Sequence, residues 1–556
     1  MSSPQLLWQT FLAVSLPCVV WVLLRQWSSR RILNKIPGPR SSSWLKGHIN
    51  EFFGPKAWDF LEQIRTQYGP TSTIGALWGG KELNIFDPKA MHHILVKDQQ
   101  IWEEEPSFLT TNALVFGKGL LATAGDLHRK QRKMLNPVFS AAHLRDMTPI
   151  FYDVVKRLSD TLTKTVSAGE QEIDVLSWSS RTALELIGQS GLGYSFDPLT
   201  DEACAHPYPA ALKALLPLME RTAPAQRLLV VHLVKIFPSW LLRLFAVHLP
   251  IRDLQELRKL ADYMWELSTE IYQGKLRALE AGDEAVHEQM SRGKDIMSVL
   301  MNQNMKASDE EKLNEEQLIG QSALARTLHL LSQRPEVQSK LRQELRAARE
   351  AQGGENVPYD ILVALPYLDA VCRETLRLYG PAPRVTREST QDAIVPFTTP
   401  VRCTDGSVIN EITLPARTKV HIDIVNANRN PELWGPDALE WKPERWLASL
   451  PSALTEAKVP GIYSHLMTFI GGGRSCIGFK FSQLEMSMYS SSAALSKAST
   501  DVTFRWLEVV LFQLVEAFEF RPTDKEIYWE SNPVVNPVVK GGPQVAKLPI
   551  RIALAK

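Results

Sequence analysis

The residue grouping best suited to chemistry is a single cysteine in a glycine-rich loop near the C-terminal end. Residues 469–478 read Phe-Ile-Gly-Gly-Gly-Arg-Ser-Cys-Ile-Gly. Three consecutive glycines let the backbone approach a flat ligand closely. A cysteine that enters a helix N-terminus is biased toward thiolate by the helix dipole and the nearby amides. Such a thiolate can be the axial ligand of a heme iron. The guanidinium of Arg474, two residues before Cys476, can then neutralise a propionate.

The same loop resembles the heme-binding signature of cytochromes P450, F-x-x-G-x-R-x-C-x-G. Every fixed position matches, at Phe469, Gly472, Arg474, Cys476 and Gly478. The resemblance covers nearly the whole chain. It implies that heme b is the cofactor, that Cys476 binds the iron and is the catalytic centre, and that Phe469, Arg474 and Gly478 bind the cofactor.

A second motif agrees with this resemblance. Glu374 and Arg377 are spaced i, i+3, which puts both charges on one helix face. Taken alone, such a pair is more often an exposed salt bridge. In the family it is buried and joined by an arginine, which corresponds here to Arg445. We therefore expect a structural ion-pair network of these three residues.

The resemblance also implies propionate partners at His128, Arg132 and Arg387. His128 stands where family members usually carry Trp, and it keeps a hydrogen-bond donor. The neighbouring basic residues Arg129, Lys130 and Lys133 are interpreted either as a solvated face or as a docking site for a reductase.

The elements that must position these residues are predicted from hydrophobic spacing. Apolar residues recur every three or four positions over 141–165, 251–280, 315–333, 336–352 and 366–379, which predicts helices. Short β-rich runs occur at 71–74, 83–86, 399–402 and 418–422, and residues 426–446 are typical of an ordered meander. The fold class expected is mainly α with a minor β-sheet portion, the cytochrome P450 fold.

The N-terminal residues predict a membrane anchor. Residues 5–24 carry no charge and are long enough to cross a bilayer as a helix. Arg25, Arg30 and Arg31 follow, which predicts a single-pass protein of the endoplasmic reticulum membrane whose catalytic domain faces the cytosol. A cleaved signal peptide is the competing interpretation. A basic and Pro-rich linker is assigned to 25–50 and the heme-thiolate domain to 51–556.

A second apolar region spans residues 228–249. Lys235, Pro238 and Arg243 interrupt it, so a spanning helix is not expected. A monotopic membrane patch and a pair of buried core helices are both compatible with these residues.

Two segments depart from the family pattern. The oxygen-activating Ala/Gly-Gly-x-x-Thr segment of the central helix is missing between Gln321 and Ser322. Compared with the family pattern, about 13 residues are absent. Their loss would shorten the helix by about 20 Å and rotate its remainder by roughly 140°. An extra Ser-rich stretch occupies 487–508. A skipped exon piece and a retained intron would explain both departures, and a genuine lineage variant is the alternative.

Composition and cysteine use narrow the functions further. The 556 residues are 44% hydrophobic with a formal net charge of +1, which gives no reason to expect a nucleic-acid partner. No CxxC occurs, and the other four cysteines are interpreted as small buried hydrophobes: Cys18, Cys204, Cys372 and Cys403.

Three functions are compatible with the sequence. The first is a monooxygenase that inserts one oxygen atom from O2 into a hydrophobic small molecule, such as a terpenoid of secondary metabolism. Its electrons would come from a separate NADPH-cytochrome reductase, because no flavin or nicotinamide site is found in the chain. The second is a reductase-independent heme-thiolate isomerase or dehydratase that acts on a peroxide. The third is a heme-binding product without turnover.

Overall fold

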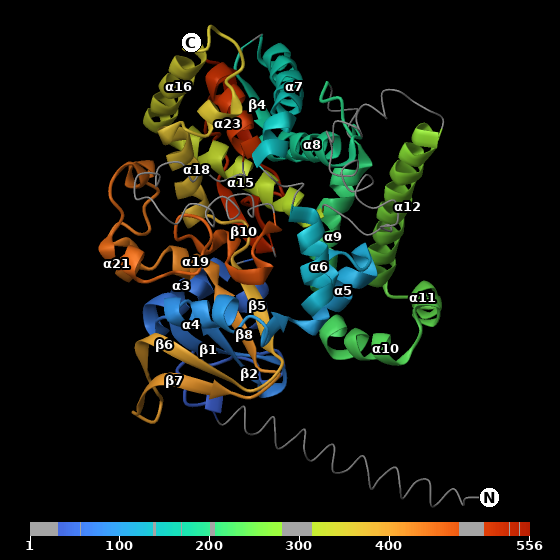
Figure 1. The fold of residues 1–556 in the computed structure, drawn as a ribbon, viewed down its shortest axis with the longest axis vertical. Coiled ribbons are helices and arrows are strands. Elements are labelled where there is room, and N and C mark those ends of the chain that lie inside the picture. Colours follow the sequence, from blue (N-terminus) through green and yellow to red (C-terminus); the bar gives the residue numbers. More distant parts are fainter. Residues whose placement is uncertain are drawn as a thin grey trace, which may run out of the picture.

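The computed structural model describes residues 32–55, 57–136, 141–167, 169–200, 206–280, 314–477, 505–532, 534–543 and 545–556. The helices lie together in one large body, and the strands gather mainly at its lower end (Figure 1). This arrangement confirms the expected helix-rich fold with minor sheets. The predicted anchor at residues 5–24 lies outside the described residues. Within the described ranges no helix is long and apolar enough to cross a bilayer.

The longer helices follow the predicted apolar spacing. The five predicted segments correspond to α7 (Ala141–Val166), α12 (Arg252–Glu280), α15 (Asn314–Gln333), α16 (Pro335–Glu350) and α18 (Pro366–Leu378). Proline at the first position of α16 and α18 suits a helix start, because that N–H has no intrahelical partner. The remaining α-helices are α2 (Ile49–Phe53), α3 (Ala57–Tyr68), α4 (Pro88–His92), α5 (Pro106–Phe116), α6 (Gly125–Leu135), α8 (Val175–Ile187), α9 (Pro207–Ala225), α10 (Val231–Ile236), α11 (Ser239–His248), α17 (Tyr359–Leu362), α19 (Ile424–Asn428), α20 (Pro431–Trp434), α21 (Ser452–Glu456) and α23 (Arg505–Ala517).

The strands form four small sheets. The largest has the order β1-β2-β8-β5-β3, in which β2 and β8 run parallel and the other neighbours run antiparallel. A three-stranded sheet has the order β4-β12-β9, and two further pairs are β6-β7 and β10-β11. The strands are β1 (Thr71–Gly75), β2 (Lys81–Ile85), β3 (Trp102–Glu104), β4 (Gln171–Asp174), β5 (Arg384–Ser389), β6 (Ala393–Arg402), β7 (Val408–Leu414), β8 (Lys419–Asp423), β9 (Phe518–Arg521), β10 (Ile527–Asn532), β11 (Val534–Val539) and β12 (Pro549–Leu554).

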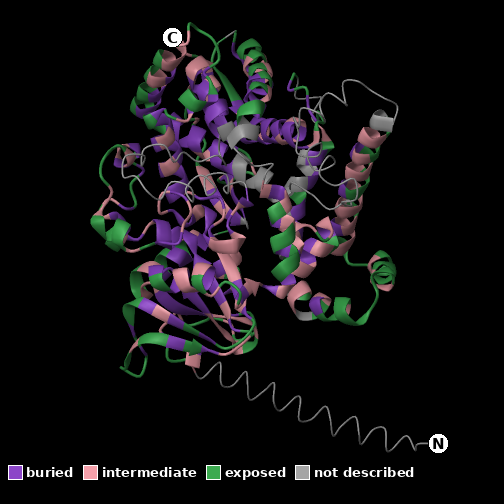
Figure 2. Cartoon of the chain, in the orientation of Figure 1, coloured by how far each residue is buried: buried purple, intermediate pink, exposed green. Residues whose placement is uncertain are grey.

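The core centres on α15, which packs against α8, α16, α18 and α23. Figure 2 shows this centre as buried. Ala323, Leu324 and Leu331 of α15 are buried in the main apolar cluster. The segment after Gln321 is therefore packed in the core, although the residues that the family pattern places before it are missing. The side chains of 314–321 lie outside the described ones.

Other sequence expectations map onto this fold with shifted bounds. Leu33 and Ile36 are buried in the main apolar cluster, so this end of the predicted linker packs on the domain. The predicted 399–402 strand is the end of the longer β6. The end of the Ser-rich stretch assigned to 487–508 belongs to α23, which begins at Arg505, and 487–504 lies outside the described residues.

Candidate active site

The cysteine loop is held by short backbone turns. Phe469 ends a turn of 3-10 helix and is buried against the ring of Tyr463, with the ring centroids 5.7 Å apart. The amide of Cys476 donates to the carbonyl of Phe469 at 3.1 Å, and the amide of Ser475 donates to the carbonyl of Gly472 at 3.1 Å. These bonds fix the backbone that leads into a partly buried thiol. Gly478 lies outside the described residues.

Two of the three glycines are explained by packing within the protein. A Cβ added to Gly472 would lie 1.8 Å from the carbonyl oxygen of Leu95, and its φ of +77° also disfavours other residues. A Cβ on Gly471 would lie 1.8 Å from the carbonyl oxygen of Pro460. The close approach that the sequence assigned to a flat ligand is thus made to neighbouring backbone.

Helix α6 carries two predicted cofactor-binding residues, and Arg132 reaches the loop. His128 and Arg132 lie one turn apart, and both are buried. Arg132 donates through Nη2 to the hydroxyl of Ser475 at 3.0 Å. The residue beside Cys476 is therefore tied to α6.

Strand β3 contacts the other two predicted propionate partners, Arg474 and Arg387. Arg474 donates from Nε and Nη2 to Glu103, at 2.9 and 2.5 Å. Arg387 of β5 donates from Nη1 to Glu104 at 2.8 Å. The structure thus brings both arginines to adjacent residues of one strand. The sequence did not predict either glutamate, although three consecutive acidic residues, 103–105, precede Pro106.

Burial dominates the electrostatics of this arginine–glutamate cluster. It raises the pKa of Glu104 above its usual value, although Arg387 and Arg474 oppose the shift. It also lowers the pKa of Arg387, against the pull of Glu104. The Nη2 of Arg387 is buried and has no hydrogen-bond partner in the part of the chain that the structure describes. An unsatisfied guanidinium edge beside the cysteine loop fits a ligand that carries carboxylates.

The ion-pair network expected from the sequence is centred on α18. Glu374 and Arg377 have no exposed side-chain surface and pair at 2.8 Å, and Arg445 reaches Glu374 at 3.3 Å. Glu374 also accepts from the amide of Lys442 and from the indole of Trp446. The network joins α18 to the meander that leads to the cysteine loop.

Two hydroxyl side chains of α15 that follow Gln321 are bonded to carbonyls of the protein. Ser322 donates to the carbonyl of Val535 at 2.5 Å, and Thr327 donates to the carbonyl of Ala323 at 2.9 Å. Both side chains are buried. Neither proton is therefore available for delivery to a bound ligand in this conformation.

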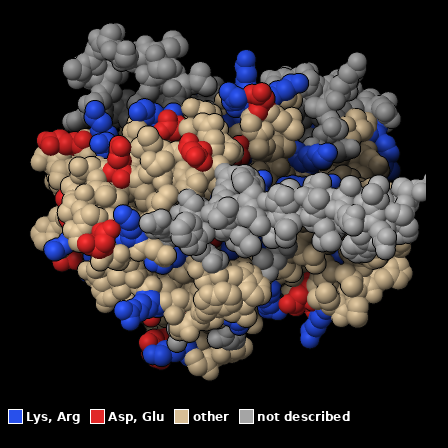
Figure 3. Space-filling model, turned by 90° about the horizontal axis from the view of Figure 1, so that it is seen from below, with Lys and Arg blue, Asp and Glu red and all other residues tan. Residues whose placement is uncertain are grey.

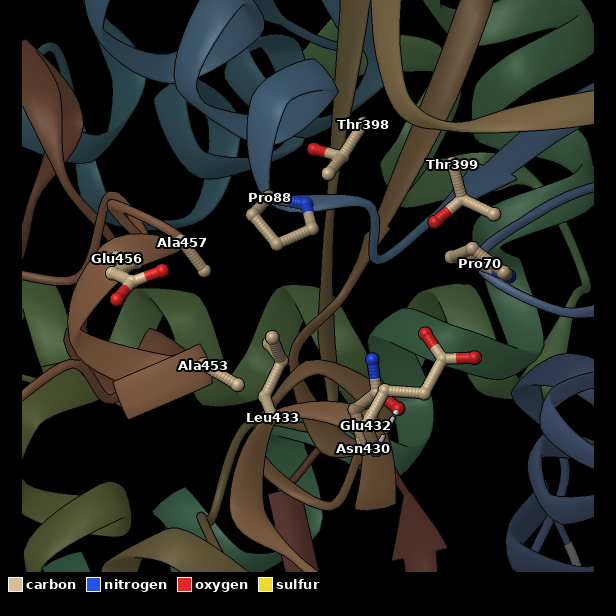
Figure 4. Close-up of a pocket in the computed structure, with 10 residues that line it drawn as sticks. All are labelled: Pro70, Pro88, Thr398, Thr399, Asn430, Glu432, Leu433, Ala453, Glu456 and Ala457. Carbon is tan, nitrogen blue, oxygen red and sulfur yellow. Dashed lines mark hydrogen bonds between the residues drawn. The ribbon is translucent and has the colours of Figure 1, made fainter. Parts of the chain in front are cut away.

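A hollow of about 280 Å³ lies elsewhere, between β6 and the meander (Figure 4). Its lining includes Pro88, Thr398 and Leu433, with the carboxylates of Glu432 and Glu456 at its edge. None of the predicted site residues lines it, so it is separate from the cysteine loop.

Comparisons with known proteins agree with this geometry. A profile of the cytochrome P450 family matches residues 37–492. Cytochrome P450 monooxygenase 91 of Postia placenta is 44% identical over 97% of this chain and 97% of its own. The ganoderic acid synthetase of Ganoderma lucidum is 43% identical over 94% of each chain. A crystal structure of a cytochrome P450 superposes with a TM-score of 0.65 at 19% identity, over 94% of this chain and 100% of that chain.

The chain belongs to the cytochrome P450 monooxygenase family. Its cofactor is heme with an axial cysteine thiolate, and bound heme supplies the chemistry that activates O2. The described residues fit that group. Cys476 offers a thiol, while the buried Arg132 and Arg387 and the half-buried Arg474 offer donors for propionates.

Proposed function

We propose that the protein is a membrane-bound monooxygenase that inserts one oxygen atom into a hydrophobic small molecule of fungal secondary metabolism, such as a terpenoid. Cys476 is its axial ligand. The observation that carries this proposal is that three arginines gather around the loop of Cys476. Arg132 and Arg387 are buried, and Arg474 of the loop itself is half-buried. The relation to the ganoderic acid synthetase supports a role in secondary metabolism.

The proposal includes a separate NADPH-cytochrome reductase as electron donor. Arg132 faces the cysteine loop from α6, while Arg129, Lys130 and Lys133 on the same helix are exposed. A basic surface beside the heme-binding loop suits an acidic electron donor, because opposite charges steer association.

A second candidate is a reductase-independent isomerase or dehydratase that acts on a peroxide. It is favoured by the α15 hydroxyls, both of which donate to backbone carbonyls. A peroxide substrate already contains its oxygen and does not require a threonine that delivers protons.

We expect turnover to require both NADPH and the reductase. The test is a terpenoid panel offered to the full chain in microsomes with and without reductase, beside a peroxide panel without NADPH. Turnover of peroxides alone would favour the second candidate, and a colourless protein would contradict both. Sequencing the transcript across Gln321–Ser322 and Met486–Val509 shows whether the missing segment belongs to the natural protein.

We further propose that the catalytic domain faces the cytosol, is anchored in the endoplasmic reticulum membrane by residues 5–24, and rests on that membrane through α10 and α11. These helices and their flanks expose a set of large apolar side chains, the α10–α11 apolar surface: Leu229, Val234, Ile236, Phe237, Trp240, Leu244, Phe245, Val247, Leu249 and Ile251. Such exposure contradicts the interpretation of 228–249 as buried core helices.

The position of this surface supports a bilayer as its partner. In Figure 1, α10 and α11 lie at the lower end of the molecule, as does the β6–β7 pair. The first described residues also lie there, since the carbonyl of Lys35 accepts from the amide of Thr404 in the β6–β7 turn. Figure 2 shows both helices as mostly exposed, and the lower face in Figure 3 carries charges of both signs among wide uncharged areas. An exposed apolar area of this kind marks an interaction site.

We expect Trp240→Ser/Phe245→Ser to weaken membrane contact of α10 and α11. Their side chains are 67% and 54% exposed, and burying such a side chain in lipid gains about 1.5–3 kcal/mol. Hydrogen exchange of the full chain in nanodiscs should be about tenfold faster in these helices for the variant. Leu439→Ser/Val545→Ser, at exposed apolar sites outside this surface, is the control. Equal exchange in all three proteins would contradict the contact.

A further inference from the structure

Strand β3 ends in Glu103 and Glu104, and Glu105 follows directly before α5. Each of these three consecutive glutamates has its own basic partners. Glu103 pairs with Arg474, Glu104 with Arg387, and Glu105 with Lys419 and Arg227. Glu104 and Arg387 are direct cross-strand neighbours in the antiparallel β3–β5 register. Facing pairs of opposite charge stabilise a sheet and fix its side chains. The strand therefore sets the position of two arginines of the cysteine loop region.

Each glutamate occupies only part of its arginine. A guanidinium has five N–H donors in a rigid planar fork. Arg474 uses Nε and Nη2 for Glu103 and the carbonyl of Thr123, which leaves Nη1 for another acceptor among the described bonds. Arg387 uses Nη1 for Glu104 and the carbonyl of Thr386, and its Nη2 remains buried and unsatisfied within the described structure.

We propose that Glu103 and Glu104 are positioning residues for heme, which hold one edge of Arg474 and Arg387 so that the opposite edge faces a propionate. The inference rests on the proposed function of the Cys476 loop. This assignment places two glutamates in a region where only basic side chains would be expected to contact the propionates of the cofactor.

The arrangement has two consequences for the loaded protein. An arginine fixed in advance loses less side-chain entropy when it binds a propionate, so heme is retained for longer. The carboxylate of Glu103 also adds negative charge near the cofactor, which disfavours the reduced state of the iron. Both properties can be measured without turnover.

The test compares heme retention in the full-length proteins carrying Glu103→Gln, Glu104→Gln or Glu105→Gln. Loss of one charge-assisted hydrogen bond corresponds to roughly a tenfold change in an equilibrium. We therefore expect heme transfer to excess apomyoglobin to be about tenfold faster for the first two variants. We also expect a higher midpoint potential for Glu103→Gln. Glu105→Gln is the matched control, because Glu105 lies on the same segment and is buried, but its partners are not the loop arginines.

The side chain of Glu103 is 26% exposed, so Glu103→Gln remains informative if Glu104→Gln fails to fold. Heme loss and potential equal to those of Glu105→Gln in both folded glutamine variants would overturn this inference alone. A wild-type chain that takes up no heme would overturn the proposed function and this inference with it.

Discussion

Cys476→Ser should abolish the thiolate spectrum of the heme protein and all NADPH-driven turnover. A thiol becomes a thiolate near neutral pH when its pKa falls modestly below about 8.5, whereas a serine hydroxyl stays protonated and is a weak iron ligand. Cys476 lies in a loop whose backbone is bonded to Phe469 and Gly472, whereas the other described cysteines, Cys372 and Cys403, lie outside this loop. We therefore expect neither to replace it as the iron ligand. The measurement is the absorption spectrum of the ferrous carbon monoxide complex together with the heme content.

Cys403→Ser is the matched control for this prediction. Cys403 is a free, buried cysteine next to the β6–β7 turn, and its amide bonds to the carbonyl of Ser407. Cys403→Ser also replaces a sulfur atom by oxygen, but at a position outside the cysteine loop. We expect its spectrum to match the wild type. An unchanged thiolate spectrum in Cys476→Ser would show that another residue binds the iron.

The sequence was informative where local spacing decides structure. The i, i+3 pair of α18 and the helical apolar spacing of α7, α12 and α16 depend on residues close in the chain. The cysteine loop is equally local, since its turn bonds link residues at most seven positions apart. The helices were therefore predicted with almost the bounds that the structure shows.

Features that depend on tertiary pairing were not predictable in the same way. The contact of Glu104 with Arg387 requires the register of β3 against β5, and these residues are 283 positions apart. The role of Gly472 depends on the carbonyl of Leu95, which lies far away in the sequence. Likewise, the 228–249 segment is compatible with burial or exposure, because apolar spacing gives the helix but not its neighbours.

Removal of the Glu374 charge should cost about 3–5 kcal/mol of the free energy of unfolding, because it leaves two buried guanidinium groups without their shared carboxylate. Glu374 accepts from Nε and Nη2 of Arg377 at 2.9 and 2.8 Å, and from Nε of Arg445 at 3.3 Å. Glu374→Gln keeps the side-chain shape but turns an amide donor toward these donors. Urea unfolding of the full chain, followed by circular dichroism, measures the effect.

The size of this loss distinguishes a buried network from an ordinary salt bridge. Asp360→Asn is the control, because Asp360 pairs with Arg145 at 2.7 Å while both side chains are more than half exposed. An exposed pair contributes about 0–1 kcal/mol, so this variant should unfold almost like the wild type. Asp437→Asn should fall between the two, because Asp437 is 28% exposed and Arg445 keeps Glu374 as a partner. Equal losses for Glu374→Gln and Asp360→Asn would contradict the structural role of the network, because of these two carboxylates only that of Glu374 bonds to the meander.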